Sequence, residues 1–188
     1  MRRISLLVAV FTLLAACSPE PFKGKDISSV EWGGDFELTA HTGKRVRASE
    51  FQGRVIVLFF GFTHCPDICP PTLMRLAQTM KLLGADAERV QVLFITVDPR
   101  RDTPKQLAGF VPAFHPSFLG LTGTEQELTA VIREYRIAAE ADTKHPGHIP
   151  HSDAILVKDV RGKLRLLFKG DHSAEDIAHD LRLLLKQQ

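Results

Sequence analysis

The chain has few cysteines, a single tryptophan and a single tyrosine, and almost no excess of charge. Three cysteines among 188 residues are too few for a disulfide framework, so each needs its own explanation. The formal net charge is +2, and Arg2 and Arg3 near the start account for both charges. Because no basic run follows that would neutralise a phosphate backbone, the composition argues against a nucleic-acid partner. With 44% hydrophobic residues, the chain suits one ordinary globular domain.

Long apolar stretches are also scarce, and the most extended one is too short to span a bilayer. It covers residues 4–14, roughly 11 residues where a spanning helix needs about 20. A basic start, this apolar stretch and small residues before Cys17 are typical of an export signal. Leu14-Ala15-Ala16-Cys17 resembles a bacterial lipobox, which implies cleavage before Cys17 and its lipidation. An ordinary signal peptide with an incidental cysteine stays open as the alternative.

The order of these features predicts three parts. Residues 1–16 form the signal, which ends at the lipobox Cys17, and residues 17–35 form a flexible tether rich in proline and glycine. Residues 36–188 form the domain. We expect a protein of the bacterial cell envelope, lipid-anchored at Cys17, with its domain facing the periplasm or another extracytoplasmic space.

Two continuous apolar runs form the centre of the expected domain. Residues 55–60 and 90–97 indicate strands that are covered on both faces. Between them, residues 72–83 carry apolar side chains at helical spacing. Strands that alternate with helices favour a mixed sheet with helices on its faces.

Turn and capping residues mark the remaining elements. Hairpins are expected to turn at Thr42-Gly43 within residues 36–47, and at Arg161-Gly162 between residues 154–157 and 164–168. Helix starts are indicated at Thr103 with Pro104 and Gln106, at Thr124 with Glu127, and at Ser173 with Asp176. We therefore predict an α/β domain with a mixed central sheet, an N-terminal hairpin, and a C-terminal β-hairpin followed by a helix. Thioredoxin-like proteins have this layout.

The loop between the first buried strand and the next helix contains Cys65 and Cys69. Their spacing on a turn that leads into a helix can bring the two sulfurs together, and the helix N-terminus favours thiolate over thiol. A thiolate is both a nucleophile in redox exchange and a soft ligand for Cu(I). A structural disulfide, a redox pair and a metal site all stay open. Three intervening residues, where thioredoxin-type oxidoreductases have two, suit a metal better.

A third ligand would complete a trigonal copper site. His145, His148 and His151 precede the strand expected over residues 154–157, and His151 lies nearest to it. Functional loops of such sheets gather at one edge, so this loop can approach the cysteines. A solvated loop histidine remains the alternative for each of the three.

Other polar residues close to these loops have less distinctive roles. Asp98 ends a buried strand, where it could accept a loop amide hydrogen bond and tune the site, or simply cap an Asp-Pro turn. Arg101 and Asp102 could pair across that turn, which would contribute under about 1 kcal/mol if exposed. His64 adjoins Cys65 and is expected to have a supporting role around the site, or a structural one.

These motifs together resemble the Sco/SenC family. The stretch Phe60-Gly-Phe-Thr-His-Cys-Pro-Asp-Ile-Cys-Pro70, the residues 97–104 and 119–123, and His151-Ser152 match that family in order and spacing, over roughly residues 36–185. The resemblance implies a thioredoxin-like fold that binds copper, as Cu(I), Cu(II) or both, through Cys65, Cys69 and His151. His145 and His148 depart from the family pattern and could bind extra copper or replace His151.

The resemblance also implies a role in assembling the dinuclear copper centre of cytochrome c oxidase. The expected partners are the copper-accepting oxidase subunit, the membrane, and a thiol reductant or another copper chaperone. A rival function, which would make the protein an enzyme, is reduction of the oxidase subunit's cysteines by the same pair without metal. A copper or redox sensor is a third hypothesis. His151 distinguishes a copper-binding protein from a pure reductase, because a reductase has no need of this histidine.

Overall fold

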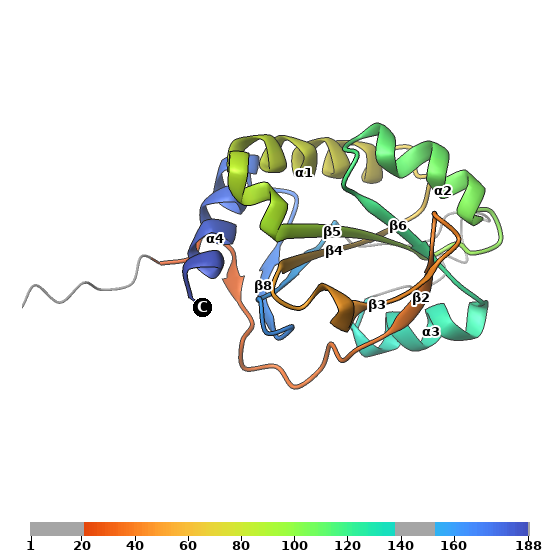
Figure 1. Ribbon diagram of the computed structural model, residues 1–188, viewed down its shortest axis with the longest axis horizontal. Helices are drawn as coiled ribbons and strands as arrows, with labels where there is room; N and C mark the ends of the chain where they lie inside the picture. The colour runs from red at the N-terminus through yellow and green to blue at the C-terminus, as the bar shows by residue number, and fades with distance from the viewer. Residues whose placement is uncertain (1–20, 138–152, 188) are drawn as a thin grey trace, which may run out of the picture.

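A computed structural model describes residues 21–137 and 153–187 of the chain (Figure 1). The strands are β1 (Lys25–Asp26), β2 (Glu37–Ala40), β3 (Arg45–Arg47), β4 (Val55–Gly61), β5 (Val90–Thr96), β6 (Leu119–Thr122), β7 (Ile155–Lys158) and β8 (Leu164–Phe168). The α-helices are α1 (Cys69–Leu83), α2 (Pro104–Phe110), α3 (Glu125–Glu134) and α4 (Ala174–Lys186), with short 3-10 turns at Ala48–Phe51, Gly84–Arg89 and Val111–Ala113. The predicted signal segment, Cys17 and the three loop histidines His145, His148 and His151 lie outside the described residues.

One mixed sheet forms the centre of the domain. Its strand order is β1-β8-β7-β4-β5-β6-β2-β3, in which β4, β5 and β6 run parallel and the other pairs run antiparallel. Every residue of β4 and of β5 is buried, because helices cover both faces of the sheet. One face packs against α1, α2 and α4, and the other packs against α3 and the N-terminal segment (Figure 1). The prediction of a mixed sheet between helices is confirmed.

The capping residues act as expected. The Thr103 side chain accepts a hydrogen bond from the Gln106 amide and opens α2. Capping boxes at Thr124 and Ser173 open α3 and α4. Both predicted hairpins form, as β2–β3 and as β7–β8. Helix α1 begins at Cys69, three residues before the predicted start, so the second cysteine lies within its first turn.

The structure corrects the predicted tether from Lys23 onward. Residues Lys25–Asp26 pair with β8, and the carboxylate of the fully buried Asp180 on α4 accepts hydrogen bonds from the backbone amides of Lys23 and Gly24 at 2.8–3.0 Å. Further along, the buried Lys158 ammonium donates to the Gly33 carbonyl at 2.9 Å. The proline and glycine content suggested a linker, yet side chains from distant elements bind its backbone, so this segment belongs to the domain.

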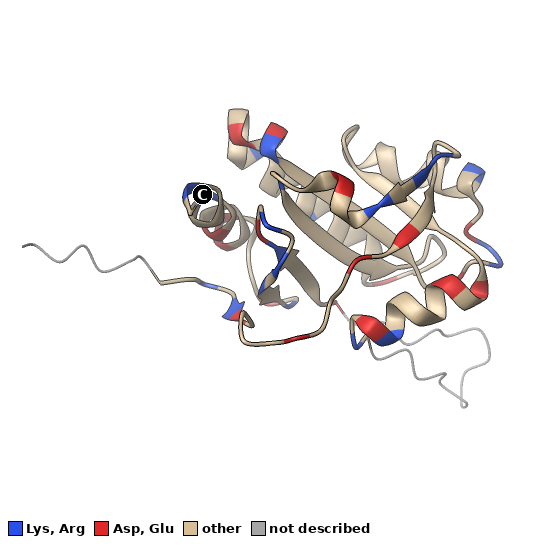
Figure 2. Ribbon diagram, turned by 60° about the horizontal axis from the view of Figure 1, so that its bottom comes forward, with Lys and Arg blue, Asp and Glu red and all other residues tan. Residues whose placement is uncertain are grey.

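No helix in residues 21–137 or 153–187 is both long and apolar enough to cross a bilayer. Figure 2 shows acidic and basic residues interspersed along the described ribbon, with several acidic ones along α3. This mixture agrees with the small net charge of the chain.

We predict that Asp180→Ala lowers the free energy of unfolding by about 2 kcal/mol or more, because the buried Gly24 amide and the partly buried Lys23 amide lose their acceptor. Chemical denaturation of both proteins measures the difference. Asp171→Ala is the matched control, since the Asp171 side chain is 83% exposed and its loss is expected to cost under about 1 kcal/mol. Equal effects of the two substitutions would contradict the assignment of Asp180 as the anchor of the N-terminal segment.

Candidate metal centre

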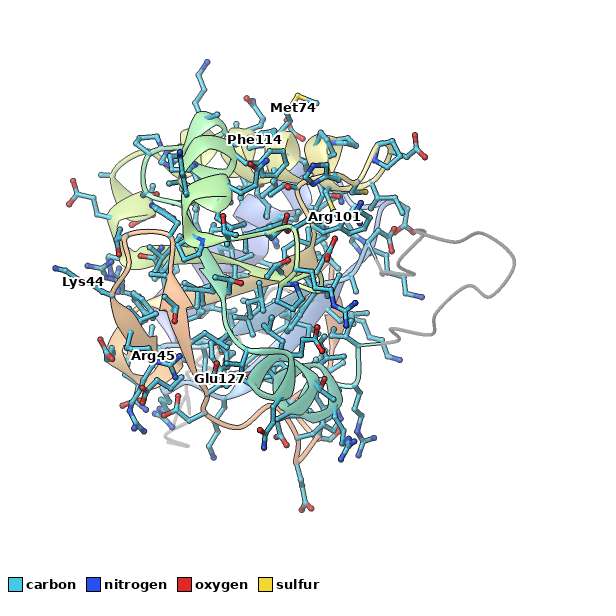
Figure 3. The ribbon with its side chains drawn as sticks, turned by 90° about the vertical axis from the view of Figure 1, so that its right-hand side faces the viewer. Lys44, Arg45, Met74, Arg101, Phe114 and Glu127 are labelled. Carbon is cyan, nitrogen blue, oxygen red and sulfur yellow. The ribbon has the colours of Figure 1, made fainter. Side chains whose placement is uncertain are left out.

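The parallel pairing of β4 and β5 brings the candidate site together. Gly61 at the end of β4 lies opposite Thr96 at the end of β5. Because the two strands end at the same edge of the sheet, the loops that follow them are neighbours. The first loop carries Cys65 and leads into Cys69, and the second carries Asp98 and Asp102. Figure 3 looks onto this edge and shows Arg101, from the second loop, lying there.

The two cysteines meet in the core beneath this edge. Cys65 is 3% exposed and Cys69 is fully buried, and both are reduced rather than joined by a disulfide. The backbone amide of Cys69 donates to Cys65 Sγ at 3.3 Å, which places the two cysteines side by side. The sequence-based expectation that spacing and turn geometry bring the sulfurs together is therefore fulfilled within the described residues.

Gly61 makes room for one of these sulfurs. A Cβ at this position would lie 2.5 Å from Cys69 Sγ and 2.9 Å from the Phe94 ring. Real Cβ atoms do not approach other atoms so closely, so only glycine lets the sulfur rest against the end of β4. In the sequence, Gly61 is only one residue of the family motif, and no local signal predicts its contact with Cys69 Sγ.

Burial decides the protonation of Cys69. It raises the pKa of the Cys69 thiol well above the ordinary value, and the neighbouring Cys65 and Asp102 add to the effect, while a hydrogen bond from the Phe62 backbone opposes it. The expectation that the helix N-terminus favours a thiolate is thus wrong for Cys69 in the absence of metal. A metal that binds here must displace the thiol proton.

Asp102 lies in a different environment from the exposed pair with Arg101 that the sequence made possible. Its side chain is fully buried. Its carboxylate accepts hydrogen bonds from the Thr63 amide at 2.9 Å, the Thr63 hydroxyl at 2.6 Å and the Thr96 hydroxyl at 2.7 Å. Arg101 instead pairs with Asp98 and places its guanidinium 5.6 Å from the centre of the Phe62 ring.

Asp98 and His64 lie around the site without touching the sulfurs in any contact that the structure gives. Asp98 is 6% exposed, and its backbone amide donates to the Thr96 hydroxyl at 2.9 Å. The half-exposed His64 has its Nδ1 2.9 Å from the Thr63 hydroxyl and 4.0 Å from an Asp102 oxygen. Both residues therefore contact the groups that hold the cysteine loop, and their supporting role stays a prediction.

The predicted third ligand, His151, and its alternatives His145 and His148 lie outside the described residues. The chain is described again from Asp153, which lines a hollow of about 390 Å³ together with Asp67 and Ile68 of the cysteine loop and Arg75 of α1. Within residues 21–137 and 153–187, no three histidine, cysteine, aspartate or glutamate side chains are grouped as metal ligands. The described part of the candidate site is therefore the pair of sulfurs, a donor set that fits a soft ion such as Cu(I).

Comparison with known proteins agrees with this arrangement. The SCO1/SenC family model matches residues 25–186. A SCO2-like protein of Rickettsia felis is 35% identical over 190 residues, which cover 95% of this chain and 93% of the relative. The structure of Bradyrhizobium japonicum ScoI with copper bound is 36% identical, with a TM-score of 0.73 over 80% of this chain and 98% of that one. Arabidopsis thaliana ScoI with copper bound is 32% identical, with a TM-score of 0.76 over 83% and 99% of the two chains. The predicted thioredoxin-like fold is confirmed.

We predict that Gly61→Ala destabilises the protein by about 1–3 kcal/mol, because the added methyl group overpacks the space between Cys69 Sγ and Phe94. Thermal or denaturant unfolding measures the loss. Gly109→Ala on α2 is the matched control, since a Cβ there meets nothing within 4 Å. An unfolding midpoint of Gly61→Ala equal to that of the control would show that the methyl group is accommodated and would contradict the assigned role.

Proposed function

The chain belongs to the SCO1/SenC family, and from this premise we propose that it binds one copper ion through Cys65, Cys69 and His151 and helps to assemble the dinuclear copper centre of cytochrome c oxidase. Copper is the cargo of this function, carried to a copper-accepting subunit of the oxidase. The observation that carries the proposal is the pair of adjacent, reduced sulfurs at the end of two buried parallel strands. Two relatives with the same fold bind copper in their solved structures.

The sulfur pair has the chemistry that the proposal requires. Thiolates are soft ligands that select Cu(I), and the dry surroundings of the two sulfurs strengthen a bond between opposite charges. The loop between them contains Pro66, and Pro70 follows Cys69 in the first turn of α1, so both prolines limit the freedom of the chain before the metal arrives. Little chain entropy is therefore lost when the two sulfurs close on one ion.

His151 is proposed as the third ligand because of its place in the chain. It precedes Asp153 by two residues, and two residues of chain span at most about 7 Å. Asp153 in turn shares a hollow with Asp67 and Ile68 of the cysteine loop. A neutral imidazole would complete a three-coordinate site that also tolerates Cu(II) better than sulfur alone.

Delivery requires the ligands to exchange with those of the partner. Both cysteines are buried, so the Cys65–Cys69 loop has to open during transfer. We further propose that Cys17 carries the lipid anchor. The segment from Cys17 to Phe22 spans at most about 18 Å, which would hold the domain close to an extracytoplasmic membrane surface.

A thiol–disulfide reductase is the second candidate, favoured by the hydrogen bond from the Cys69 amide to Cys65 Sγ, which holds the two cysteines side by side. In this function one sulfur attacks a substrate disulfide and the other resolves the mixed disulfide, so two electrons pass to the substrate and the pair becomes a disulfide. The reductase needs no metal and no His151. Copper binding and thiol reduction therefore respond differently to His151→Ala.

The test uses the full chain in detergent with Cys17→Ser, so that Cys65 and Cys69 are its only thiols. Titration of the reduced protein with Cu(I) against a chromophoric chelator is expected to give one copper per chain. Cys65→Ser and Cys69→Ser should each weaken binding more than about a hundredfold, and His151→Ala about tenfold or more, because each removes a ligand.

His148→Ala and His145→Ala test the other histidines of the same segment, and His41→Ala on the β2–β3 turn is the remote control. We expect these three variants to bind within about threefold of the parent protein. Copper binding that is insensitive to His151→Ala, together with intact reduction of a peptide disulfide, would replace the proposal with the reductase.

The raised pKa of Cys69 predicts how binding depends on pH. Below that pKa the thiol is protonated, and copper must release its proton, so a higher pH lowers the cost of binding. The apparent affinity should rise about tenfold per pH unit for each proton released between pH 6 and pH 8. Competition titrations at several pH values, corrected for the chelator's own protonation, measure the slope. A flat profile would show that Cys69 is already a thiolate or is not a ligand.

A further inference from the structure

We propose that Asp102 is a positioning residue for the cysteine pair, whose buried carboxylate fixes the backbone two residues before Cys65 and thereby sets where the two sulfurs lie. The expected effect of Asp102 on copper affinity rests on the proposed function above. Its expected effect on the dithiol–disulfide equilibrium of Cys65 and Cys69 does not depend on that function, because it concerns only the metal-free protein.

Both carboxylate oxygens of Asp102 accept hydrogen bonds from the cysteine loop or from the neighbouring strand. Oδ2 accepts from the Thr63 amide at 2.9 Å and from the Thr96 hydroxyl at 2.7 Å, while Oδ1 accepts from the Thr63 hydroxyl at 2.6 Å. Thr96 ends β5, and Thr63 lies in the loop that follows β4. One buried carboxylate thus joins the strand end, the cysteine loop and the turn before α2.

The hydrogen-bond directions make this carboxylate purely an acceptor. The Thr96 hydroxyl accepts from the Asp98 amide at 2.9 Å, so its own hydrogen is available to Asp102. The Thr63 amide can only donate. A carboxylate that holds a loop through a backbone N–H fixes the loop more firmly than a neutral acceptor would, because such charge-assisted hydrogen bonds are roughly twice as strong.

The fixed backbone at Thr63 leads directly to the sulfurs. Thr63 lies inside the turn closed by the hydrogen bond from the Cys65 amide to the Phe62 carbonyl at 3.2 Å. Cys65 Sγ in turn accepts a hydrogen bond from the Cys69 backbone amide at 3.3 Å. A shift at Thr63 therefore moves Cys65 relative to the start of α1, where Cys69 is held.

The test measures the dithiol–disulfide equilibrium of the metal-free full chain, in detergent and with Cys17→Ser. Oxidised dithiothreitol accepts two electrons and two protons as the Cys65–Cys69 disulfide forms, and the ratio at equilibrium gives the constant. Asp102→Asn keeps the shape of the side chain but replaces one acceptor oxygen with an NH2 group, so at least one hydrogen bond to the loop is lost. We expect a shift of about tenfold or more toward the dithiol, because a loosened loop lowers the effective concentration of one sulfur at the other.

Asp180→Asn is the matched control. It alters an equally buried carboxylate that also accepts hydrogen bonds from backbone amides. This carboxylate lies on α4, near the β1 edge of the sheet (Figure 1). This variant should lower the unfolding midpoint while it leaves the thiol equilibrium within about twofold of the parent protein. Thr63→Val removes only the hydroxyl donor and is expected to shift the equilibrium in the same direction as Asp102→Asn. The double variant should shift it by less than the two single effects combined, since both remove the same contact.

The proposal is overturned if Asp102→Asn and Thr63→Val both fold and keep the equilibrium of the parent protein, or if Asp180→Asn shifts it as much as they do. If Asp102→Asn does not fold, Thr63→Val alone decides. In a second measurement, Cu(I) affinity should fall about tenfold in Asp102→Asn. Absence of copper binding in the parent protein would reject the proposed function, while the thiol equilibrium would still test Asp102.

Discussion

The parallel pairing of β4 with β5 is the constraint on which the rest of the site depends. Its register places Gly61 beside Thr96, so the loops that follow the two strands leave the sheet at one edge. The first loop supplies the two sulfurs, and the second supplies the carboxylate that holds the first. Because β4 and β5 are buried along their whole length, the close packing of the core fixes where the two strands end. A metal site that must keep its ligands in a set geometry gains most from such a support.

Burial has two opposing effects at this edge. It keeps Cys69 protonated, because a thiolate without a cation is costly in a dry environment. It also strengthens the attraction between a thiolate and a bound cation once the proton has left. Burial therefore disfavours the Cys69 thiolate as long as no cation is bound. In the proposed function, copper binding and disulfide formation would be alternative fates of the same pair, which would link the chaperone function to thiol chemistry.

Much of the fold could be predicted from local patterns. The continuous apolar run at residues 55–60 favours a central strand covered on both faces. The capping residues Thr103, Thr124 and Ser173 mark helix starts by their own chemistry. Strand β1 was missed because it is two polar residues long, Lys25–Asp26, and pairs with a strand far along the chain. No periodicity can emerge from so short an element, and its proline and glycine neighbours pointed to a linker.

The sequence by itself determined that two cysteines, four positions apart, would follow a buried strand and enter a helix, so their sulfurs would meet. That conclusion needs only strand burial, turn geometry and residue spacing. Only the tertiary structure decided that Asp102 is buried and accepts hydrogen bonds from Thr63 and Thr96. The same holds for the contact of Asp180 with the N-terminal segment and for the raised pKa of the Cys69 thiol. These features join residues 39 and 157 positions apart, or follow from desolvation by the whole core. An aspartate beside a proline or an arginine looks the same in sequence whether it faces water or three donors, because its role is set by what the fold places around it.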